Sequence, residues 1–292
     1  MEVTNSLVKK DDKPKTFSAF LSTDAMKKKI NEMVGGEKGQ QFITAIISAV
    51  SANSTLAECD NASIVSAALL GQSLNLSPSP QLGHYYLVPF NDKEKGKVAQ
   101  FQIGYKGYIQ LAIRSGYYKK LNVLAIKEGE LNRYDPLNEE IDVKLIEDEE
   151  IREQTPTIGY YAMFEYHNGF RKVLYWSKTK MENHARQYSQ GYRRDIQKGT
   201  NYTFWSKDFD GMAYKTMLRQ LISKWGIMSI ELQTAMEKDM SEIKEDGSYE
   251  YVDNIEENNA DITPKENIVE TVTEQNDNEI IETNEDNSFF DN

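Results

Sequence analysis

Basic and aromatic side chains are interleaved along one stretch of the sequence, residues 171–224. This stretch holds 12 lysines or arginines against four acidic residues. Its aromatic residues include Tyr175, Trp176, Tyr188, Tyr192, Tyr202, Phe204, Trp205 and Tyr214. Cations bind phosphates, and aromatic rings offer faces on which unpaired bases stack. The stretch therefore indicates single-stranded nucleic-acid binding, with a hydrophobic core under a solvated lysine face as an equal alternative.

Helical spacing separates two of these cations from the apolar residues around them. A helix predicted from Asp208 to Lys224 has an apolar stripe made of Met217, Leu218, Leu221, Ile222 and Trp225. Lys215 and Arg219 stand four positions apart on another face. No acidic residue lies four positions from either one. We therefore expect these two cations to contact phosphate rather than to form surface ion pairs.

An earlier predicted helix, residues 106–115, carries a second polar stripe. Lys106, Gln110 and Arg114 lie on this stripe, while Ile113 is predicted to point inward. The exposed NH groups and partial positive charge of a helix start favour an anion. Lys106 lies at that start, so the first turn is a second candidate phosphate site.

Motifs for catalysis are scarce. The sequence has no GxxxxGKS/T phosphate loop, no GxSxG elbow and no HExxH pair. With one cysteine, Cys59, and three histidines, neither an intramolecular disulfide nor a zinc site is expected. Two acidic pairs, Asp208 with Asp210 and Asp92 with Glu94, fit a Mg²⁺-dependent nuclease, but such pairs more often cap helices or lie in solvated loops. We expect no enzyme activity, and the nuclease is the alternative.

The net charge of −12 hides regions of different charge. Residues 241–292 hold 17 acidic and two basic residues, and residues 128–153 hold 11 acidic and three basic ones. Their net charges are −15 and −8, so the remainder of the chain carries +11. A basic body suits a polyanionic partner. An interaction scaffold that binds through its acidic tail is a further alternative.

These counts divide the chain into three predicted parts. Residues 1–16 form a flexible basic arm, residues 17–240 a DNA-binding, oligomer-forming domain, and residues 241–292 an acidic disordered tail. The amino terminus lacks a secretory signal, and the longest apolar run, near Ala45 to Val50, is too short to span a bilayer. We expect a cytoplasmic protein that does not enter the membrane.

Predicted helices and strands come in blocks. Helices are predicted at residues 24–34, 41–52, 62–74, 106–115, 177–188, 208–224 and 230–240, with Asn61 as the N-cap of the third. Strands are predicted at residues 84–90, 98–104, 121–127, 141–146, 157–166 and 170–176, with a long loop in the first hairpin and Asn168-Gly169 as the last turn. Residues 190–203 are predicted to form a glycine-punctuated loop. The pattern is that of an α+β fold, with a small antiparallel sheet packed against helical N-terminal and C-terminal parts.

Several motifs occur in a recognisable order within the domain. Residues 74–78 read LNLSP and residues 83–90 read GHYYLVPF. Residues 104–116 read GYKGYIQLAIRSG, and Trp205 precedes DFDGMAYKTMLR at residues 208–219. In this order they resemble the L.L.P....YLVPF, GYKGxIxLAxRSG and W..DF..MA.KT..R motifs of the RecT family of phage and prophage single-strand annealing proteins. The resemblance covers the domain and leaves out the tail.

The resemblance implies a function and a set of partners. RecT-like proteins bind single-stranded DNA without ATP, assemble into rings or helical filaments, and anneal complementary strands in phage homologous recombination in the bacterial cytoplasm. The implied partners are single-stranded DNA, the annealed duplex intermediate, further copies of the chain, a phage exonuclease and a host single-strand-binding protein. No cofactor is expected, and a Mg²⁺ dependence of annealing is left open.

We predict the DNA-binding residues from the motifs and the basic stretch together. They are Lys97, Tyr105, Lys106, Arg114, Lys119, Arg193, Arg194, Tyr202, Lys207, Lys215 and Arg219. Apart from Lys97, the cations are expected to line one groove that leaves the base edges open for pairing, with Tyr105, Tyr192 or Tyr202 near bases or sugars. The helices before Asn75, with the lysine cluster Lys27-Lys28-Lys29, are predicted to supply the subunit interface.

Overall fold

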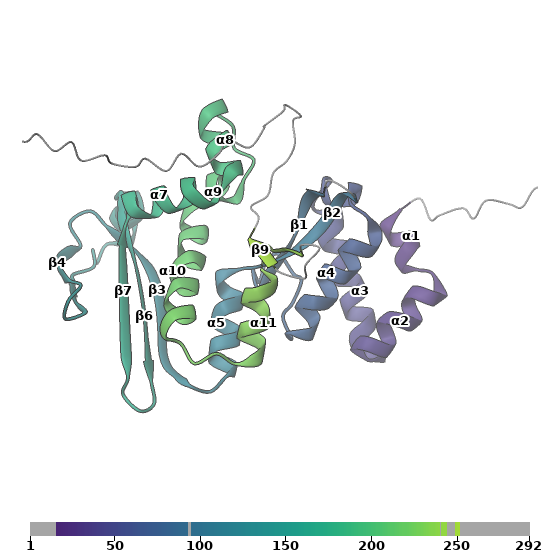
Figure 1. Ribbon diagram of the computed structural model, residues 1–292, viewed down its shortest axis with the longest axis horizontal. Coiled ribbons are helices and arrows are strands. Elements are labelled where there is room, and N and C mark those ends of the chain that lie inside the picture. Colours follow the sequence, from purple (N-terminus) through teal and green to yellow (C-terminus); the bar gives the residue numbers. More distant parts are fainter. Residues whose placement is uncertain (1–15, 93–94, 240, 244–248, 252–292) are drawn as a thin grey trace, which may run out of the picture. The chain divides into compact units, whose positions relative to one another are not determined.

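The computed structural model describes residues 16–92, 95–239, 241–243 and 249–251 (Figure 1). The fold is α+β, with 51% helix and 24% strand, and its small antiparallel sheets pack against helices. The predicted fold class is confirmed. In the part of the chain that the structure describes, no helix is long and apolar enough to cross a membrane.

The N-terminal part is a group of helices. They are α1 (Phe17–Leu21), α2 (Asp24–Val34), α3 (Gly36–Ser51), the 3-10 turn η1 (Leu56–Glu58) and α4 (Asn61–Ser73). The bounds of α2 are as predicted, and Gly35 ends it with φ of 90°. The cap of α4 is Asp60 rather than the predicted Asn61, because the Asp60 carboxylate accepts the Ser63 NH at 2.9 Å.

The first hairpin packs on these helices. Strands β1 (Tyr85–Asp92) and β2 (Gly96–Ile103) pair from Tyr85 opposite Ile103 to Asp92 opposite Gly96. The connection is therefore shorter than the predicted long loop. Tyr85 is fully buried, and its hydroxyl donates to the Ala68 carbonyl at 3.1 Å. These contacts build the first hydrophobic core from α1–α4, β1 and β2, with α5 and α11 closing it.

A three-stranded sheet forms the second layer of the fold. Helix α5 (Tyr105–Arg114) leads to β3 (Tyr118–Lys127), which pairs with β6 (Thr157–Tyr166), and β6 pairs with β7 (Arg171–Ser177). The predicted hairpin turn is confirmed, with Gly169 at φ of 87°. Tyr160, Phe164 and Trp176 of this sheet pack with Met217 of the long helix α10 in a second core.

The acidic segment between β3 and β6 forms its own small unit. Strands β4 (Leu131–Asp135) and β5 (Glu140–Val143) pair with each other, and α6 (Glu149–Gln154) follows. No residue of α6 is buried. The segment is therefore a largely solvated addition beside the three-stranded sheet, as its composition predicted.

The remaining helices are α7 (Lys178–Tyr188), α8 (Gln190–Lys198), α9 (Phe204–Lys207), α10 (Phe209–Trp225) and α11 (Ile230–Lys238). The loop predicted at residues 190–203 is wrong over its first nine residues, which form α8. Ser189 caps α8 by accepting the Tyr192 NH at 3.0 Å, and Gly199 ends it at φ of 65°. The glycine that indicated a loop, Gly191, lies buried in the first turn.

Two predicted orientations differ from the structure. Ile113 is 57% exposed rather than inward. In the stripe of α10, Met217, Leu218 and Leu221 are fully buried as predicted, whereas Trp225 at its end is partly exposed.

Strands β8 (Ser241–Ile243) and β9 (Tyr249–Tyr251) pair after α11. The predicted basic arm and most of the predicted acidic tail lie outside the described residues, so both stay predictions.

Candidate nucleic-acid interface

Lys215 and Arg219 point to one buried carboxylate of the same chain. Asp239, at the end of α11, is 1% exposed. Its Oδ1 lies 2.8 Å from Lys215 Nζ, and its Oδ2 lies 3.2 Å from an Arg219 guanidinium nitrogen. The Ile103 NH and the Tyr108 hydroxyl also donate to it, at 3.1 and 3.4 Å. We call these five residues the Asp239 cluster.

The Asp239 cluster differs from the predicted surface clamp. The Lys215 side chain is only 5% exposed, so its ammonium lies inside the fold. A charge is buried at acceptable cost only when it is paired and hydrogen-bonded, and Asp239 provides that pairing. Burial, and then the charge of Asp239, raise the pKa of Tyr108 above its ordinary value, so its hydroxyl stays protonated and can donate. In this structure the two cations of α10 hold the end of α11, and their contact with DNA stays a prediction.

A second buried carboxylate organises the turn between α8 and α9. Asp195 is 4% exposed and accepts five hydrogen-bond donors. The hydroxyls of Thr200 and Ser206 each lie 2.7 Å from it. The NH and the hydroxyl of Thr203 each lie at 2.8 Å, and the Tyr202 NH at 3.1 Å. We call these residues the Asp195 loop.

The charge state of Asp195 follows from these donors. Burial by itself raises the pKa of Asp195, but the hydrogen bonds from Ser206, Thr200 and Thr203 outweigh it and hold the pKa well below its ordinary value. Asp195 is therefore ionised at neutral pH. Its five donors are neutral hydroxyls and backbone NH groups, so they bind the carboxylate without drawing an arginine or lysine inward.

Four of the predicted DNA-binding residues lie on or beside the Asp195 loop. Arg193 and Lys207 are exposed, and Arg194 is half-exposed. The NH of Tyr202 donates to Asp195, and Tyr202 is 62% exposed. Cations beside an accessible ring have the chemistry that binds the phosphates of a single strand and stacks its bases.

Phe204, at the start of α9, extends this surface to β1 and α5. The centroid of its ring lies 5.7 Å from that of Tyr86. Lys106 lies near the hydroxyl end of Tyr86: a Cβ placed on Gly83 would lie 3.0 Å from the Tyr86 hydroxyl and 3.4 Å from Lys106 Cδ. The candidate surface therefore consists of Tyr86, Lys106, Arg193, Arg194, Tyr202, Phe204 and Lys207.

Two glycines allow α5 to start directly against β1. A Cβ on Gly104 would lie 2.2 Å from the Gly83 carbonyl oxygen, and a Cβ on Gly107 would lie 2.1 Å from the His84 carbonyl oxygen. Any side chain at either position would force the backbone apart. These glycines therefore bring Lys106 to the edge of β1, and anion binding by the helix start itself stays a prediction.

Arg114, at the end of α5, binds backbone carbonyls. Its guanidinium donates to the carbonyls of Leu74 and Asn75, at 2.7 and 3.2 Å. It thereby fastens the segment between α4 and β1. Burial, then the charges of Arg114 and Lys106, lower the pKa of His84, which is therefore neutral at neutral pH.

Tyr105 and Tyr192 are half-buried supports of the candidate surface. The ring of Tyr105 packs edge-on against Tyr214, with 5.5 Å between centroids. The ring of Tyr192 lies 6.1 Å from both Trp205 and Phe209. Of the three tyrosines predicted near bases, Tyr202 is the exposed one.

Lys97 and Lys119 lie apart from the candidate surface. Lys97 is at the loop end of the β1–β2 hairpin and pairs with Glu58, whereas Tyr105 follows the opposite end of β2. Lys119, at the start of β3, pairs with Glu165 at 2.6 Å. The structure therefore does not gather the predicted cations into one groove. It divides them among the candidate surface, the Asp239 cluster and separate local contacts.

The acidic residues considered for a nuclease have structural partners. Asp208 caps α10 by accepting the Gly211 NH at 2.9 Å, and Asp210 accepts the Tyr160 hydroxyl at 2.6 Å. Asp92 accepts a backbone NH of its own hairpin, and the second member of its pair lies outside the described residues. Within the described ranges, no three His, Cys, Asp or Glu residues are arranged to hold a metal ion.

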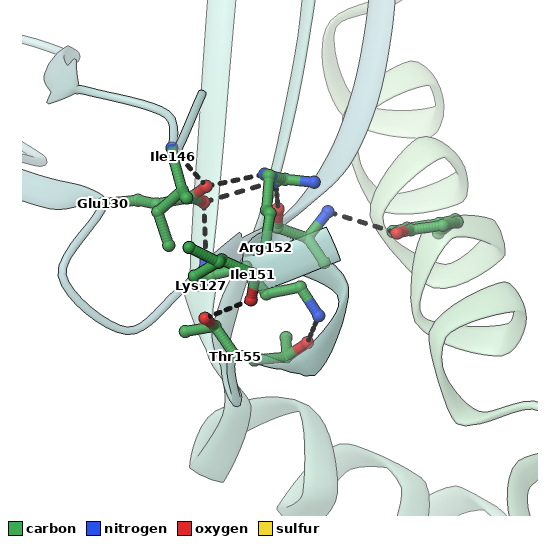
Figure 2. Close-up of polar contacts among 9 residues, drawn as sticks. Lys127, Glu130, Ile146, Ile151, Arg152 and Thr155 are labelled. Carbon is green, nitrogen blue, oxygen red and sulfur yellow. Dashed lines mark hydrogen bonds and ion pairs between the residues drawn. The ribbon is translucent and has the colours of Figure 1, made fainter. Parts of the chain in front are cut away.

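A buried ion pair anchors the acidic segment to the sheet (Figure 2). Glu130 is fully buried, and its carboxylate lies 2.6 Å from Arg152 Nε. The NH groups of Lys127 and Ile146 donate to it at 2.8 and 3.1 Å. Burial raises the pKa of Glu130, but Arg152 and these NH groups lower it by more, so the net change is downward. Arg152 also donates to the Ala125 carbonyl at 2.8 Å and so ties α6 to β3.

The sequence prediction left out Asp195, Asp239, Tyr86 and Phe204 as site residues. For Asp195 a signal was present, because Thr200, Thr203 and Ser206 follow it within 11 positions. For Asp239 there was none, since its partners come from three distant elements.

Comparison with known proteins shows which sequences this chain is similar to. The RecT family model matches residues 40–251. The chain is 40% identical over 238 residues to YqaK of Bacillus subtilis, an uncharacterized protein, covering 82% of this chain and 75% of that one. It is 32% identical over 214 residues to Protein RecT of Escherichia coli, covering 69% of this chain and 75% of that one. The family match runs from within α3 to the end of β9.

Proposed function

This chain belongs to the RecT family, and on that premise we propose that it binds single-stranded DNA and anneals complementary strands during recombination. It acts without ATP and as an oligomer, either a ring or a helical filament. Family membership supports the annealing role. The candidate surface supplies the chemistry for holding the strand.

One observation carries the proposal: the Asp195 loop has an exposed ring, that of Tyr202, and the helices on either side of the loop carry the exposed cations Arg193 and Lys207. Tyr202 stacks on bases, while Arg193, Arg194 and Lys207 bind the phosphates on either side. The ring binds the face of a base and leaves its pairing edge open. A second strand can therefore pair with a strand that is held in this way.

Annealing on such a surface needs no energy source. Duplex formation releases about 1.4 kcal/mol per base-pair step, so the reaction runs downhill. Repulsion between phosphates and self-pairing of the single strands slow it. A basic surface reduces the first, and an extended strand avoids the second.

The proposal includes the partners that the family resemblance implies. A phage exonuclease exposes the single strands, and a host single-strand-binding protein hands them over. No cofactor is required, and any dependence of annealing on Mg²⁺ reflects its action as a counterion rather than cleavage. The protein works in the cytoplasm of the bacterial host.

A strand-annealing assay with two labelled complementary oligonucleotides tests the proposal. The double variant Arg193→Ala with Arg194→Ala is expected to anneal several-fold more slowly. Each lost phosphate contact also flattens the dependence of log affinity on log salt by about 0.7 on a single strand. End-labelled DNA incubated with Mg²⁺ in parallel detects cleavage.

The matched control removes two exposed cations elsewhere, as Arg133→Ala with Lys144→Ala in the acidic segment. This variant should anneal like the parent. Equal losses in both double variants would mean that net charge alone matters. Cleaved strands, or a parent chain that neither binds nor anneals, would refute the proposed function.

A further inference from the structure

One end of the three-stranded sheet carries an exposed apolar patch. Its large side chains are Tyr117, Phe170, Trp225, Ile227, Met228 and Ile230, each at least 37% exposed. They come from the start of β3, the β6–β7 turn and the connection between α10 and α11 (Figure 1). Contiguous exposed patches of this kind mark interaction surfaces. We call this patch the apolar end.

Tyr166 shows that these segments form one surface. Its ring stacks on Phe170 with 5.9 Å between centroids and lies 5.1 Å from the ring of Tyr118. Its hydroxyl accepts the Ile227 NH at 2.6 Å. One buried tyrosine thus contacts the β6–β7 turn, the start of β3 and the α10–α11 connection.

Cations surround the apolar end. The ammonium groups of Lys172 and Lys224 lie 4.3 and 5.8 Å from the centroid of the Trp225 ring. Arg171 is exposed at the same turn. Lys172 also pairs with Glu139. Glu231, next to Ile230, is an exposed acid at the same end. Arg171 and Lys224 are therefore the cations of the rim that can face a second chain.

The opposite end of the sheet carries exposed acids around exposed aliphatic side chains. The acids are Glu147, Asp148, Glu149, Glu150 and Glu153, in and just before α6. Leu145 and Ile151 are exposed among them. We call this surface the acidic end.

Strand register places the two surfaces far apart. Tyr118 of β3 is opposite Tyr166 of β6, and Lys127 is opposite Thr157. The apolar end lies at the first pair, and α6 ends just before Thr157 at the second. The nine steps from Tyr118 to Lys127 span about 30 Å at roughly 3.3 Å per residue.

We propose that the apolar end of one subunit binds the acidic end of a second copy of this chain. The carboxylates of Glu149, Glu150 and Glu153 face the cations of the rim, and Ile151 with Leu145 covers the aromatic patch. A second copy of this chain is the proposed partner because its acidic end is complementary to the apolar end in both charge and apolar character. The inference rests on the proposed self-association and names the two surfaces that form the contact between subunits.

The two surfaces differ, so the contact repeats. A bound pair leaves one apolar end and one acidic end exposed, and a heterologous contact of this kind closes into a ring or continues as a helix. Neither surface includes the Asp195 loop. Assembly therefore leaves the candidate DNA surface accessible on every subunit.

Charge reversal with mixing tests the contact. One variant carries Glu149→Lys, Glu150→Lys and Glu153→Lys, and the other carries Arg171→Glu with Lys224→Glu. Sedimentation is measured with and without a single-stranded oligonucleotide. Each variant alone is expected to sediment as a 33.5 kDa monomer where the parent assembles. An equimolar mixture regains assemblies, because opposite charges again face each other at both kinds of contact.

Several outcomes would overturn the proposal. These are a parent chain that stays monomeric under both conditions, variants that assemble like the parent, and a mixture that stays monomeric. The variant Lys27→Glu, Lys28→Glu and Lys29→Glu on α2 tests the subunit interface that the sequence predicted at the N-terminal helices. Loss of assembly in this variant, with normal assembly of the other two, would also overturn the proposal. Oligonucleotide binding is measured separately on the monomeric variants. If the parent chain itself fails to bind the oligonucleotide, that result counts against the proposed function, not against the contact.

Discussion

Two aspartates are buried almost equally in this chain, yet their partners differ in charge. Asp239 is 1% exposed and Asp195 4%. Asp239 forms ion pairs with Lys215 and Arg219, so two basic side chains are directed into the fold. Asp195 accepts neutral hydroxyl and NH donors. The cations on and beside its loop point outward.

The difference shows what makes a basic residue available to a ligand. The cations of both regions belong to the same basic stretch, residues 171–224, and both aspartates lie within the family match. Around Asp195, short polar side chains satisfy the carboxylate, and Arg193 and Lys207 stay at the surface. Around Asp239, the long cationic side chains of Lys215 and Arg219 are the donors. The local source of hydrogen-bond donors therefore decides which cations stay at the surface.

Replacing Asp239 is expected to have the largest effect. Asp239→Asn removes one partner from a buried ion pair, which costs about 3–5 kcal/mol of unfolding free energy. Denaturant unfolding measures this loss. Glu231→Gln, an exposed acid on the same helix, is the control and should change stability by less than about 0.5 kcal/mol. A similar small change for Asp239→Asn would contradict the interior role of Lys215.

Asp195→Asn is expected to cost less, about 1–3 kcal/mol, because hydrogen bonds are lost but no ion pair is broken. The pKa of Asp195 lies below its ordinary value in the folded state. Its contribution is therefore complete above the unfolded-state pKa of about 4 and is lost as pH falls through the folded-state value.

Unfolding free energies of parent and Asp195→Asn, measured against pH, check this sign. Their difference should stay constant from about pH 7 to about pH 5 and shrink below about pH 4. A difference that grows on acidification would mean that Asp195 is not held as a carboxylate by its neutral donors.

Tyr202→Ala should weaken oligonucleotide binding with little change in stability. A base stacked on an aromatic ring contributes about 1–3 kcal/mol, and the Tyr202 ring is exposed. Fluorescence anisotropy of a labelled oligonucleotide gives the affinity. Tyr188→Ala, another exposed tyrosine that lies outside the candidate surface and the apolar end, is the matched control. If both variants bind equally well, the Asp195 loop does not present a stacking ring.

Asp208→Ala should have the smallest effect. Asp208 is exposed and caps α10 through the Gly211 NH, and loss of an N-cap costs about 1 kcal/mol. Thermal unfolding measures it. Annealing should be unchanged, whereas a nuclease centred on Asp208 would lose Mg²⁺-dependent cleavage. This variant allows the loss of stability on removing a surface carboxylate to be compared with the losses on removing the two buried ones.

Local signals in the sequence were enough for most elements. Gly35 and Ser177 mark helix ends, and Asn168-Gly169 marks a tight turn, so α2, α7 and the β6–β7 hairpin were predicted closely. The error at α8 arose because glycine was given more weight than the cap at Ser189. A buried glycine in a helix is visible only once its packing is known.

The site was predicted only in part because burial depends on distant residues. Helical phase correctly set Lys215 and Arg219 apart from the apolar stripe of α10. Their acceptor, Asp239, follows them by 24 and 20 positions, beyond any helical spacing. Arg193, Arg194 and Tyr202 were named from composition alone. Their grouping depends on the hydrogen bonds of Asp195, which no periodicity reveals.

The Asp239 cluster also sets an order for events during synthesis. Its hydrogen bonds to Ile103 and Tyr108 join residues 136 and 131 positions apart. A ribosome adds about 5–20 residues per second, so roughly ten seconds separate the appearance of β2 from that of its partner. A chain that stops before residue 239 lacks the ion pair that holds α10 to α11. Unfinished domains are therefore less stable than finished ones.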